Sequence, residues 1–236
     1  MALGNHGIEQ VDGTVLCELP GGGRALFTGR AHGNLSTMRG EGHERGRQAR
    51  DALCEGLGLQ WLCASRQVHG TAVQRVCVAG GAGGQAVAID ADGHATARGE
   101  LGMMVLTADC LPVALGTTGA VAMLHAGWRG LAAGVLEEGV RALEDLGGDG
   151  RPTAVIGPGA GACCYEVGPE VHAVFGGAVG VRGNIDLHAI ARERLLAAGV
   201  AEVRDLELCT ICDQRWFSHR REGARAGRQA GVAWLS

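Results

Sequence analysis

The chain contains no lysine, because all 21 of its Lys and Arg positions are Arg. Schiff-base catalysis, a pyridoxal phosphate linkage and a Walker-type phosphate loop each require a lysine, so all three are excluded. Glycine, in contrast, is abundant, with 42 residues. We interpret most of the arginines and glycines as a bias of the coding sequence rather than as functional residues.

Long apolar runs are also absent. No stretch of about 18 apolar residues is present, so no transmembrane helix is expected. Residues 1–10 lack the basic start and apolar centre of a signal peptide. The net charge of −4 gives no strong attraction to nucleic acids or membranes. We therefore expect a cytoplasmic monomer that binds neither nucleic acid nor membranes.

The apolar pattern in the middle of the chain predicts buried strands followed by a helix. Residues 101–107, 111–115 and 120–124 are nearly continuous apolar runs, typical of buried strands. Residues 131–146 carry apolar side chains at helical spacing. Because successive strands often follow one another directly, as in hairpins, the pattern favours an α+β fold over a doubly wound parallel sheet.

Nothing in the sequence indicates a linker or an internal repeat. We therefore expect residues 1–236 to form a single compact domain of mixed β-sheets covered by helices. The first strand is predicted at residues 24–28, and residues 1–23 are expected to be a peripheral N-terminal segment. A Gly-rich turn is predicted at residues 79–85.

The chain has 9 cysteines, an odd number that argues against a complete set of disulfides. Without a signal peptide, most should be reduced thiols. Cys209 and Cys212 have the C-x-x-C spacing of a redox pair or of half a zinc site. Because no second C-x-x-C is present, a four-cysteine zinc site is not favoured, and a structural role is preferred for this pair.

Three strings carry the residue types of a metal site. His69 lies in Gln-Val-His-Gly, Cys110 in Ala-Asp-Cys, and His125 in His-Ala-Gly-Trp-Arg-Gly. Imidazole and thiolate are ligands that zinc selects, and three protein ligands leave a position open for water or substrate. Each residue alone would more often be structural, but each follows or adjoins a predicted strand. The set therefore predicts a catalytic metal site.

The same three residues permit a metal-free interpretation. Cys110 would be the nucleophile, and His125 or His69 its general base. A bound metal would occupy the thiolate, so the two interpretations compete, and the spacing does not decide between them.

The neighbours of the trio offer supporting roles. Asp109 could orient a ligand histidine, or simply form a turn. Arg129 could hold an anion or remain solvated, and Trp128 could stack on a planar substrate or pack in the core. The small residues 157–167 could bind phosphate or an oxyanion through backbone N–H groups, or form a turn required by packing.

These strings together resemble one family. QVHG (67–70), TADCLPV (107–113), HAGWRGLAAGV (125–135), CCYEVGPEV (163–171) and FSHRREG (217–223) resemble the multicopper polyphenol oxidase-like family, also called the laccase-domain or YfiH family. The resemblance extends from about residue 27 to residue 235. Residues 28–36 keep Arg30 and Ser36 but not the family's spacing in this loop, a threonine-arginine pair followed by Gly-Gly-Val-Ser.

The resemblance implies a zinc site, with Cu²⁺ as another possible occupant, at His69, Cys110 and His125. It also implies phosphorolysis of purine nucleosides (adenosine, inosine, guanosine and methylthioadenosine) with adenosine deaminase activity. Arg30 and Arg129 would then bind the substrate or its phosphate. The alternatives are a cysteine hydrolase or amidase that edits peptidoglycan precursors, a copper polyphenol oxidase, and a non-catalytic metal-binding module. The 9 histidines are too few and scattered for the several copper centres of a true laccase.

Overall fold

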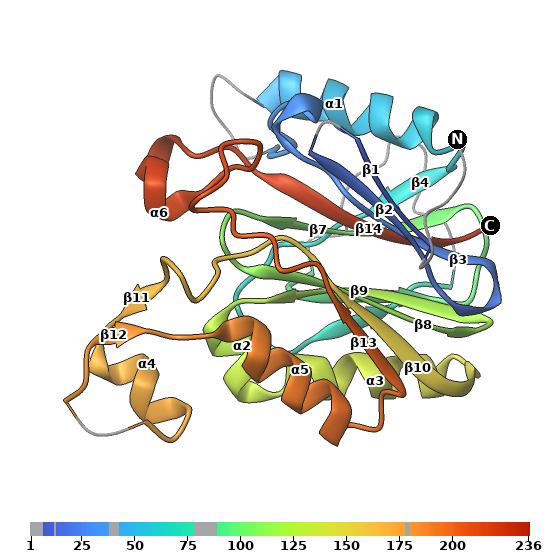
Figure 1. The fold of residues 1–236 in the computed structure, drawn as a ribbon. Helices are drawn as coiled ribbons and strands as arrows, with labels where there is room; N and C mark the ends of the chain where they lie inside the picture. The colour runs from blue at the N-terminus through green and yellow to red at the C-terminus, as the bar shows by residue number, and fades with distance from the viewer. Residues whose placement is uncertain (1–6, 12, 38–42, 78–88, 178–179) are drawn as a thin grey trace.

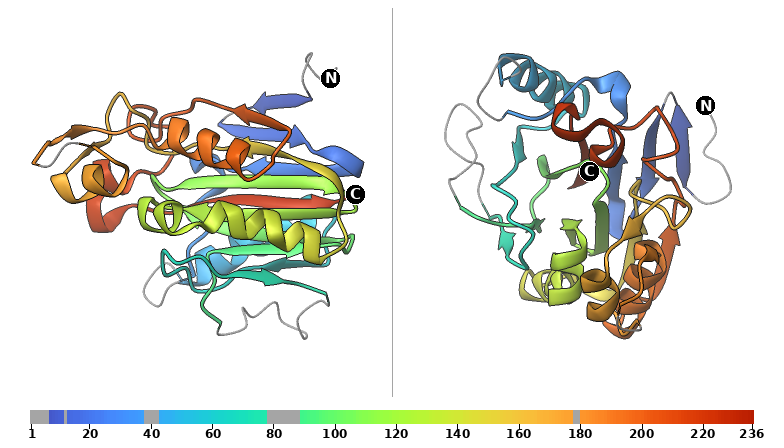
Figure 2. Two further views of the ribbon diagram at one scale, coloured as in Figure 1. Left: turned by 90° about the horizontal axis from the view of Figure 1, so that it is seen from below. Right: turned by 90° about the vertical axis from the view of Figure 1, so that its left-hand side faces the viewer.

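The computed structural model describes residues 7–11, 13–37, 43–77, 89–177 and 180–236. Two six-stranded sheets pack face to face between helices, giving four layers (Figure 1). The end-on view in Figure 2 shows the helices on the two outer faces. This is the predicted α+β fold in a single compact domain, with mixed sheets covered by helices. Among the described residues, no helix is long and apolar enough to cross a membrane. The Gly-rich turn predicted at residues 79–85 lies outside the described residues.

The first sheet is antiparallel except for its last pair of strands, which is parallel. Its order is β1 (Ile8–Val11), β2 (Thr14–Glu18), β3 (Gly23–Phe27), β14 (Gln229–Leu235), β7 (Leu101–Thr107) and β4 (Trp61–Cys63).

The second sheet is mixed, with parallel pairs at both edges. Its order is β13 (Glu202–Asp205), β10 (Asp149–Ile156), β8 (Leu111–Thr118), β9 (Ala120–Ala126), β6 (Gly93–Thr96) and β5 (Val73–Arg75).

Helices cover the outer face of each sheet (Figure 1). The helix α1 (His43–Gly56) lies on the first sheet, and α2 (Trp128–Ala133), α3 (Val135–Asp145) and α5 (Leu187–Ala197) lie on the second. At one end, α4 (Pro169–Val174) projects with the small sheet of β11 (Glu166–Val167) and β12 (Gly183–Asn184), and α6 (His219–Glu222) lies above it. Short 3₁₀ turns occur at Pro20–Gly22, Arg30–His32 and Gly223–Arg225.

The strands are apolar on both faces because each sheet has a covering layer on either side. In β7, Met103 and Val105 pack between the two sheets, whereas Met104 packs under α1. Alternate residues of a strand point to opposite faces, so a strand covered on both sides needs an unbroken apolar run. This explains why the runs at 101–107 and 120–124 were readable in the sequence.

Two predicted boundaries are wrong for local backbone reasons. The single helix predicted over residues 131–146 is broken at Gly134, whose φ of 103° is left-handed and ends α2. The strand predicted at residues 111–115 is longer, because β8 continues to Thr118 and the chain reverses at Gly119 with φ 89°.

The N-terminal segment expected to be peripheral contains an edge hairpin. Strands β1 and β2 pair with each other, and β2 pairs with β3. Val15 and Cys17, on the inward face of β2, are buried in the core between the sheets. Only the outer strand of this segment is thus peripheral.

Candidate metal centre

The fold brings His69, Cys110 and His125 together from three separate loops and strands. Cys110 lies in the turn between β7 and β8, and the pairing of Leu111 with Ala126 places it next to His125 of β9. His69 lies in the segment between β4 and β5. One ligand atom from each residue lies within 4.8 Å of the others, and His69 Nε2 is 3.9 Å from Cys110 Sγ.

The cluster is open on one side only. His125 is buried, Cys110 is partly buried and His69 is exposed. The two imidazole rings meet edge to face, with centroids 4.9 Å apart and an interplanar angle of 71°. A group held by all three side chains would therefore be reached by solutes from the His69 side.

A buried carboxylate, Asp92, holds both histidines in place. Its side chain is fully buried and accepts a hydrogen bond from Nδ1 of His125 at 2.8 Å. It also accepts the backbone N–H groups of the loop that carries His69: Val68 at 3.1 Å, His69 at 2.9 Å and Gly70 at 2.7 Å. With Nδ1 of His125 committed to the carboxylate, Nε2 is the nitrogen left for the cluster.

Burial raises the pKa of Cys110, but the charge and hydrogen bond of His125 outweigh burial and lower it to about 6. Burial likewise lowers the pKa of His125, and the Cys110 charge and the Asp92 hydrogen bond raise it to about 9. Without a metal, the pair is therefore a thiolate and an imidazolium near neutral pH. The thiolate is also the form in which cysteine binds a metal.

The backbone is adapted to the cluster. A Cβ at Gly127 would lie 2.8 Å from His69 Cδ2 and 3.0 Å from Cys110 Sγ, so only glycine leaves room for both ligands. His69 and Asp109 have positive φ values of 60° and 90°, a backbone conformation that non-glycine residues adopt at a cost. The two imidazoles, the thiolate and the glycine cradle fit a soft or borderline metal ion.

Asp109 does not occupy the position that was predicted for it. Its carboxylate accepts hydrogen bonds from Thr210 Oγ1 at 2.7 Å and from the backbone N–H of Arg220 at 2.6 Å. Asp92 instead contacts His125. Asp109 thus ties the Cys110 turn to the loop after β13 and to the start of α6.

The two predicted substrate arginines lie in different surroundings. The Arg30 guanidinium pairs with Glu222 at 2.5 Å, donates to Trp216 O at 3.0 Å and lies over the Phe217 ring. Arg129 is exposed and lies 4.2 Å above the Trp128 ring. Gly127 packs against His69 and Cys110, and Arg129 follows it by two residues. Of the two arginines, Arg129 is therefore the one next to the cluster in sequence.

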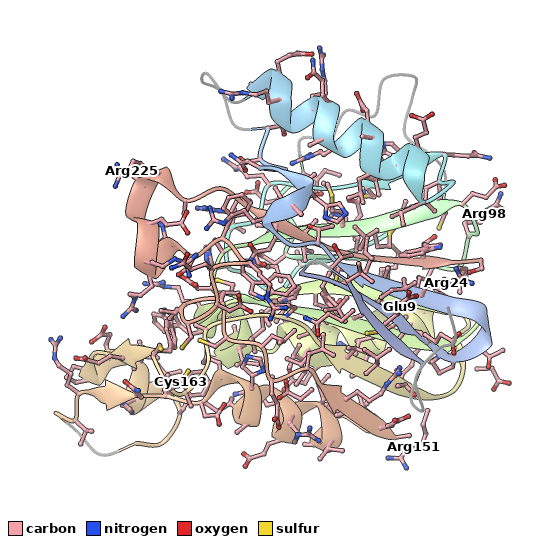
Figure 3. The ribbon with its side chains drawn as sticks, turned by 45° about the horizontal axis from the view of Figure 1, so that its top comes forward. Glu9, Arg24, Arg98, Arg151, Cys163 and Arg225 are labelled. Atoms are coloured by element: carbon pink, nitrogen blue, oxygen red, sulfur yellow. The ribbon has the colours of Figure 1, made fainter. Side chains whose placement is uncertain are left out.

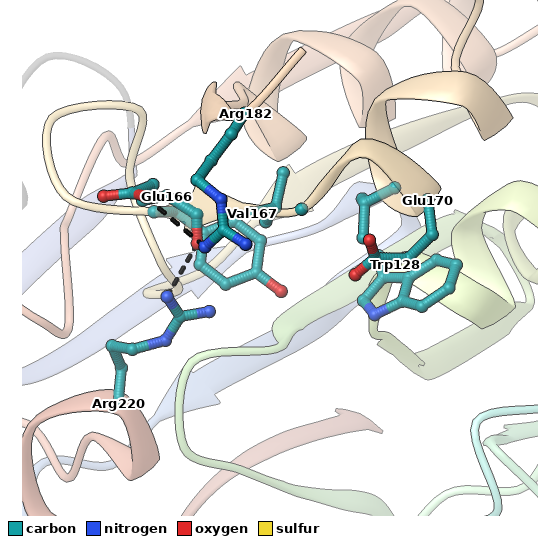
Figure 4. A pocket seen from close by; sticks show the side chains of 9 residues that line it. Trp128, Glu166, Val167, Glu170, Arg182 and Arg220 are labelled. Carbon is teal, nitrogen blue, oxygen red and sulfur yellow. Dashed lines mark hydrogen bonds and ion pairs between the residues drawn. The ribbon is translucent and has the colours of Figure 1, made fainter. Parts of the chain in front are cut away.

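A cavity of about 390 Å³ is lined by Trp128, the residue after Gly127, whereas His69, Cys110 and His125 are not among its lining residues. Figure 4 shows Arg182 and Arg220 on one side, around Glu166, and Trp128 with Glu170 on the other. Its other lining residues are Tyr165, Val167, Gly168 and Val171. Burial, together with the nearby Cys110 and Asp109 charges, raises the pKa of the Tyr165 phenol. The cavity therefore combines two aromatic rings with two arginines, within electrostatic reach of Cys110.

Asp92, Tyr165 and Arg182 carry no sequence signal that assigns them to the site, whereas Arg220 could be expected from the sequence to reach an anionic site. Asp92 precedes β6, and only the pairing of β6 with β9 brings it to His125. Tyr165 directly precedes β11, Arg182 lies in the segment before β12, and Arg220 lies in α6; these are short elements with weak sequence signals.

Comparisons with known proteins agree with this architecture. Residues 23–236 match the family model described as multi-copper polyphenol oxidoreductase laccase. A purine nucleoside phosphorylase of Xylella fastidiosa is 39% identical, covering 92% of this chain and 88% of that protein. A purine nucleoside phosphorylase of Corynebacterium glutamicum is 34% identical, covering 90% and 94%. The crystal structure of YlmD from Geobacillus stearothermophilus has a TM-score of 0.84 at 28% identity, covering 98% of this chain and 99% of that one.

Proposed function

Because the chain belongs to the multi-copper polyphenol oxidoreductase laccase family, whose relatives here are named purine nucleoside phosphorylases, we propose that it is a zinc-dependent purine nucleoside phosphorylase. The observation that carries this proposal is the cluster of His69, Cys110 and His125, together with a cavity of aromatic rings and arginines whose Tyr165 lies within electrostatic reach of Cys110.

The metal would be held by His69 Nε2, Cys110 Sγ and His125 Nε2. When bound there, zinc supplies a Lewis acid and lowers the pKa of a water molecule. The open side at His69 supports zinc, since catalytic zinc sites keep one position for water or substrate. Copper on the same ligands is the other occupant to test.

The cavity supports a nucleoside and a phosphate as substrates. Its volume lies within the range of about 300–1,000 Å³ found for small-molecule sites. Trp128 and Tyr165 offer faces for a planar purine. Arg220 and Arg182 in the cavity, with Arg129 beside it, offer guanidinium groups for phosphate.

In phosphorolysis, an oxygen of phosphate bonds to C1′ of the ribose as the bond from C1′ to the purine nitrogen breaks. The arginines would hold the phosphate against C1′, and the aromatic rings would orient the base as it leaves with a proton. Deamination of adenosine to inosine is the second activity we propose, with water replacing the amino group. Inosine, guanosine, adenosine and methylthioadenosine are the proposed substrates, and the protein is proposed to act as a monomer.

The test is purine release from each nucleoside by zinc-loaded protein, with and without phosphate. We expect free purine only when phosphate is present, and inosine from adenosine without it. Cys110→Ala should reduce purine release by about 10²-fold or more. Cys77→Ser is the matched control, because Cys77 is exposed and outside the cluster. No purine release from any nucleoside by fully metal-loaded protein would contradict the proposal.

One observation favours a second function, a cysteine hydrolase or amidase acting on peptidoglycan precursors. Cys110, His125 and Asp92 form a thiolate, imidazolium and carboxylate series, with His125 bonded to Asp92 at 2.8 Å. This is the arrangement of a cysteine nucleophile, its base and the orienting acid. Turnover of an amide substrate by protein without metal would favour it over the phosphorylase.

A further inference from the structure

Four cysteines meet at a second cluster, apart from the ligand trio. Cys163 and Cys164 lie in the loop after β10, and Cys209 and Cys212 in the loop after β13. Their Sγ atoms all lie within 4.8 Å of one another. Cys212 Sγ is 3.3 Å from that of Cys163 and 2.7 Å from that of Cys164. Figure 3 shows sulfur atoms gathered beside the labelled Cys163.

The backbone places these thiols, since the two loops are paired before the cysteines are reached. Strands β10 and β13 are parallel neighbours, so both loops leave the sheet at the same edge. The loops then continue together: Thr210 N donates to Gly159 O at 2.8 Å, and Gly159 N donates to Leu208 O at 3.1 Å. The four sulfur atoms therefore converge through main-chain pairing.

We propose that Cys163, Cys164, Cys209 and Cys212 bind one zinc ion in a closed site of four thiolates. Four thiolates around a single zinc at about 2.3 Å would lie about 3.8 Å from one another. The Sγ atoms here lie within 4.8 Å of one another, and the 3.3 and 2.7 Å separations from Cys212 would lengthen around an ion. Four protein ligands leave no open position, so the ion would be structural. The site does not depend on the proposed phosphorylase reaction.

The surroundings of the cluster suit sulfur that carries negative charge. The backbone N–H of Gly161 donates to Cys209 Sγ at 3.3 Å, and such hydrogen bonds stabilise metal-bound thiolates. A Cβ at Gly161 would lie 3.3 Å from Cys209 Sγ and 3.4 Å from Cys163 Sγ. Arg221 donates to the carbonyls of Thr210 at 2.7 Å and Ile211 at 2.9 Å, which puts a positive charge beside an ion site that would carry a net negative charge.

An iron–sulfur cluster fits less well. Its thiolates bind separate iron atoms, so they lie further apart than thiolates that share one ion. A disulfide would use two of the four thiols and leave the other two without a role.

The zinc would join the cavity wall to the Cys110 turn. Tyr165 and Glu166 directly follow Cys164 and line the cavity. On the other loop, Thr210 donates to Asp109 at 2.7 Å, and Ala160 N donates to Asp109 O at 2.7 Å. The ion would thus fix Tyr165 relative to Cys110 without contacting a substrate.

The test is the metal content of the purified full chain by mass spectrometry. We expect about two zinc ions per chain in the wild type. Cys209→Ser/Cys212→Ser should retain about one, Cys110→Ala should also retain about one, and Cys77→Ser should retain about two. The zinc lost in Cys209→Ser/Cys212→Ser and the zinc lost in Cys110→Ala are measured separately. Failure of this proposal is therefore distinguishable from failure of the trio as a metal site.

Cobalt substitution provides a second test, in which wild type with blocked thiols can replace the variant if the variant does not fold. The sulfur-to-cobalt charge-transfer absorption grows with the number of thiolate ligands. With all sites filled, it should be about fivefold stronger than in the Cys209→Ser/Cys212→Ser variant or in wild type whose four thiols are blocked. A metal content of one ion per chain that stays the same when these cysteines are replaced or blocked would overturn the proposal. So would a disulfide among them in protein purified and alkylated without reductant.

Discussion

Asp92 accepts a hydrogen bond from His125 Nδ1 at 2.8 Å while its other contacts hold the loop of His69. One fully buried carboxylate thus fixes a strand residue and a loop residue of the same cluster. Buried carboxylates are costly unless fully hydrogen-bonded, and here both oxygens are used. The cluster is therefore built around Asp92 as much as around the three proposed ligands.

Replacing Asp92 tests this relationship. Asp92→Asn should weaken zinc binding at the trio about 10–100-fold, because the amide no longer fixes His125 in the tautomer that leaves Nε2 free. Competition against a zinc chelator measures the affinity. Asp90→Asn is the control, since Asp90 is exposed and pairs with Arg66 at 2.6 Å. Unchanged affinity in Asp92→Asn would show that Asp92 serves the fold alone.

Gly127→Ala should weaken zinc binding at the trio without unfolding the chain. Its added Cβ would press on His69 Cδ2 and Cys110 Sγ at 2.8 and 3.0 Å. We expect zinc affinity to fall at least about tenfold, with Tm changing little because the exposed His69 can move. Gly56→Ala is the matched control, because nothing lies within 4 Å of a Cβ there. Equal zinc affinity in the two variants would refute the close packing of the trio.

The reactivity of Cys110 should depend on pH and on metal. The lowered pKa of about 6 means that the thiolate is present above about pH 6 and is lost as the pH falls through that value. In metal-free protein, alkylation of Cys110 by iodoacetamide should therefore rise with a midpoint at about pH 6 rather than in the usual range near about 8.5. Peptide mass spectrometry measures it residue by residue.

Zinc should suppress this alkylation, since the thiolate would be a ligand. His125→Gln in metal-free protein should move the midpoint upwards, because it removes the charge that favours the thiolate. Rapid alkylation of Cys110 in zinc-loaded protein would instead support the cysteine hydrolase.

Replacing Arg30 should mainly change stability, whereas replacing Arg220 should mainly change phosphate binding. Arg30→Met should lower Tm, since it removes the ion pair with Glu222 and the bond to Trp216 O, while the KM for phosphate stays within about twofold. Arg220→Met should raise the KM for phosphate about tenfold, because its side chain lines the cavity over Tyr165. A raised phosphate KM in Arg30→Met would restore the substrate role that the sequence predicted for it.

The layered core could be predicted from sequence because its strands are covered on both faces. The runs at Leu101–Thr107 and Ala120–Ala126 are apolar at nearly every position. The hairpin of β1 and β2 was missed because these strands are short and half exposed.

The trio could be predicted from residue type, since imidazoles and a thiolate beside strands suggest a metal. The residues that contact the trio could not be predicted, because they are brought there by strand pairing. Asp92 reaches His125 only because β6 pairs with β9. Likewise, the four-thiol cluster needs β10 beside β13. Cys163 and Cys164 are adjacent and lack the C-x-x-C spacing. The sequence pattern therefore did not favour a four-cysteine site, although the fold brings the four thiols together.

Phosphorus NMR of zinc-loaded protein with inosine and inorganic phosphate is the most direct test of the central claim. We predict that the phosphate signal declines as a ribose 1-phosphate signal grows, in step with hypoxanthine release. The same sample of Cys110→Ala should show neither change, and Cys77→Ser should behave as wild type. Hypoxanthine released with free ribose and no ribose 1-phosphate would contradict phosphorolysis, as would a Cys110→Ala sample as active as wild type.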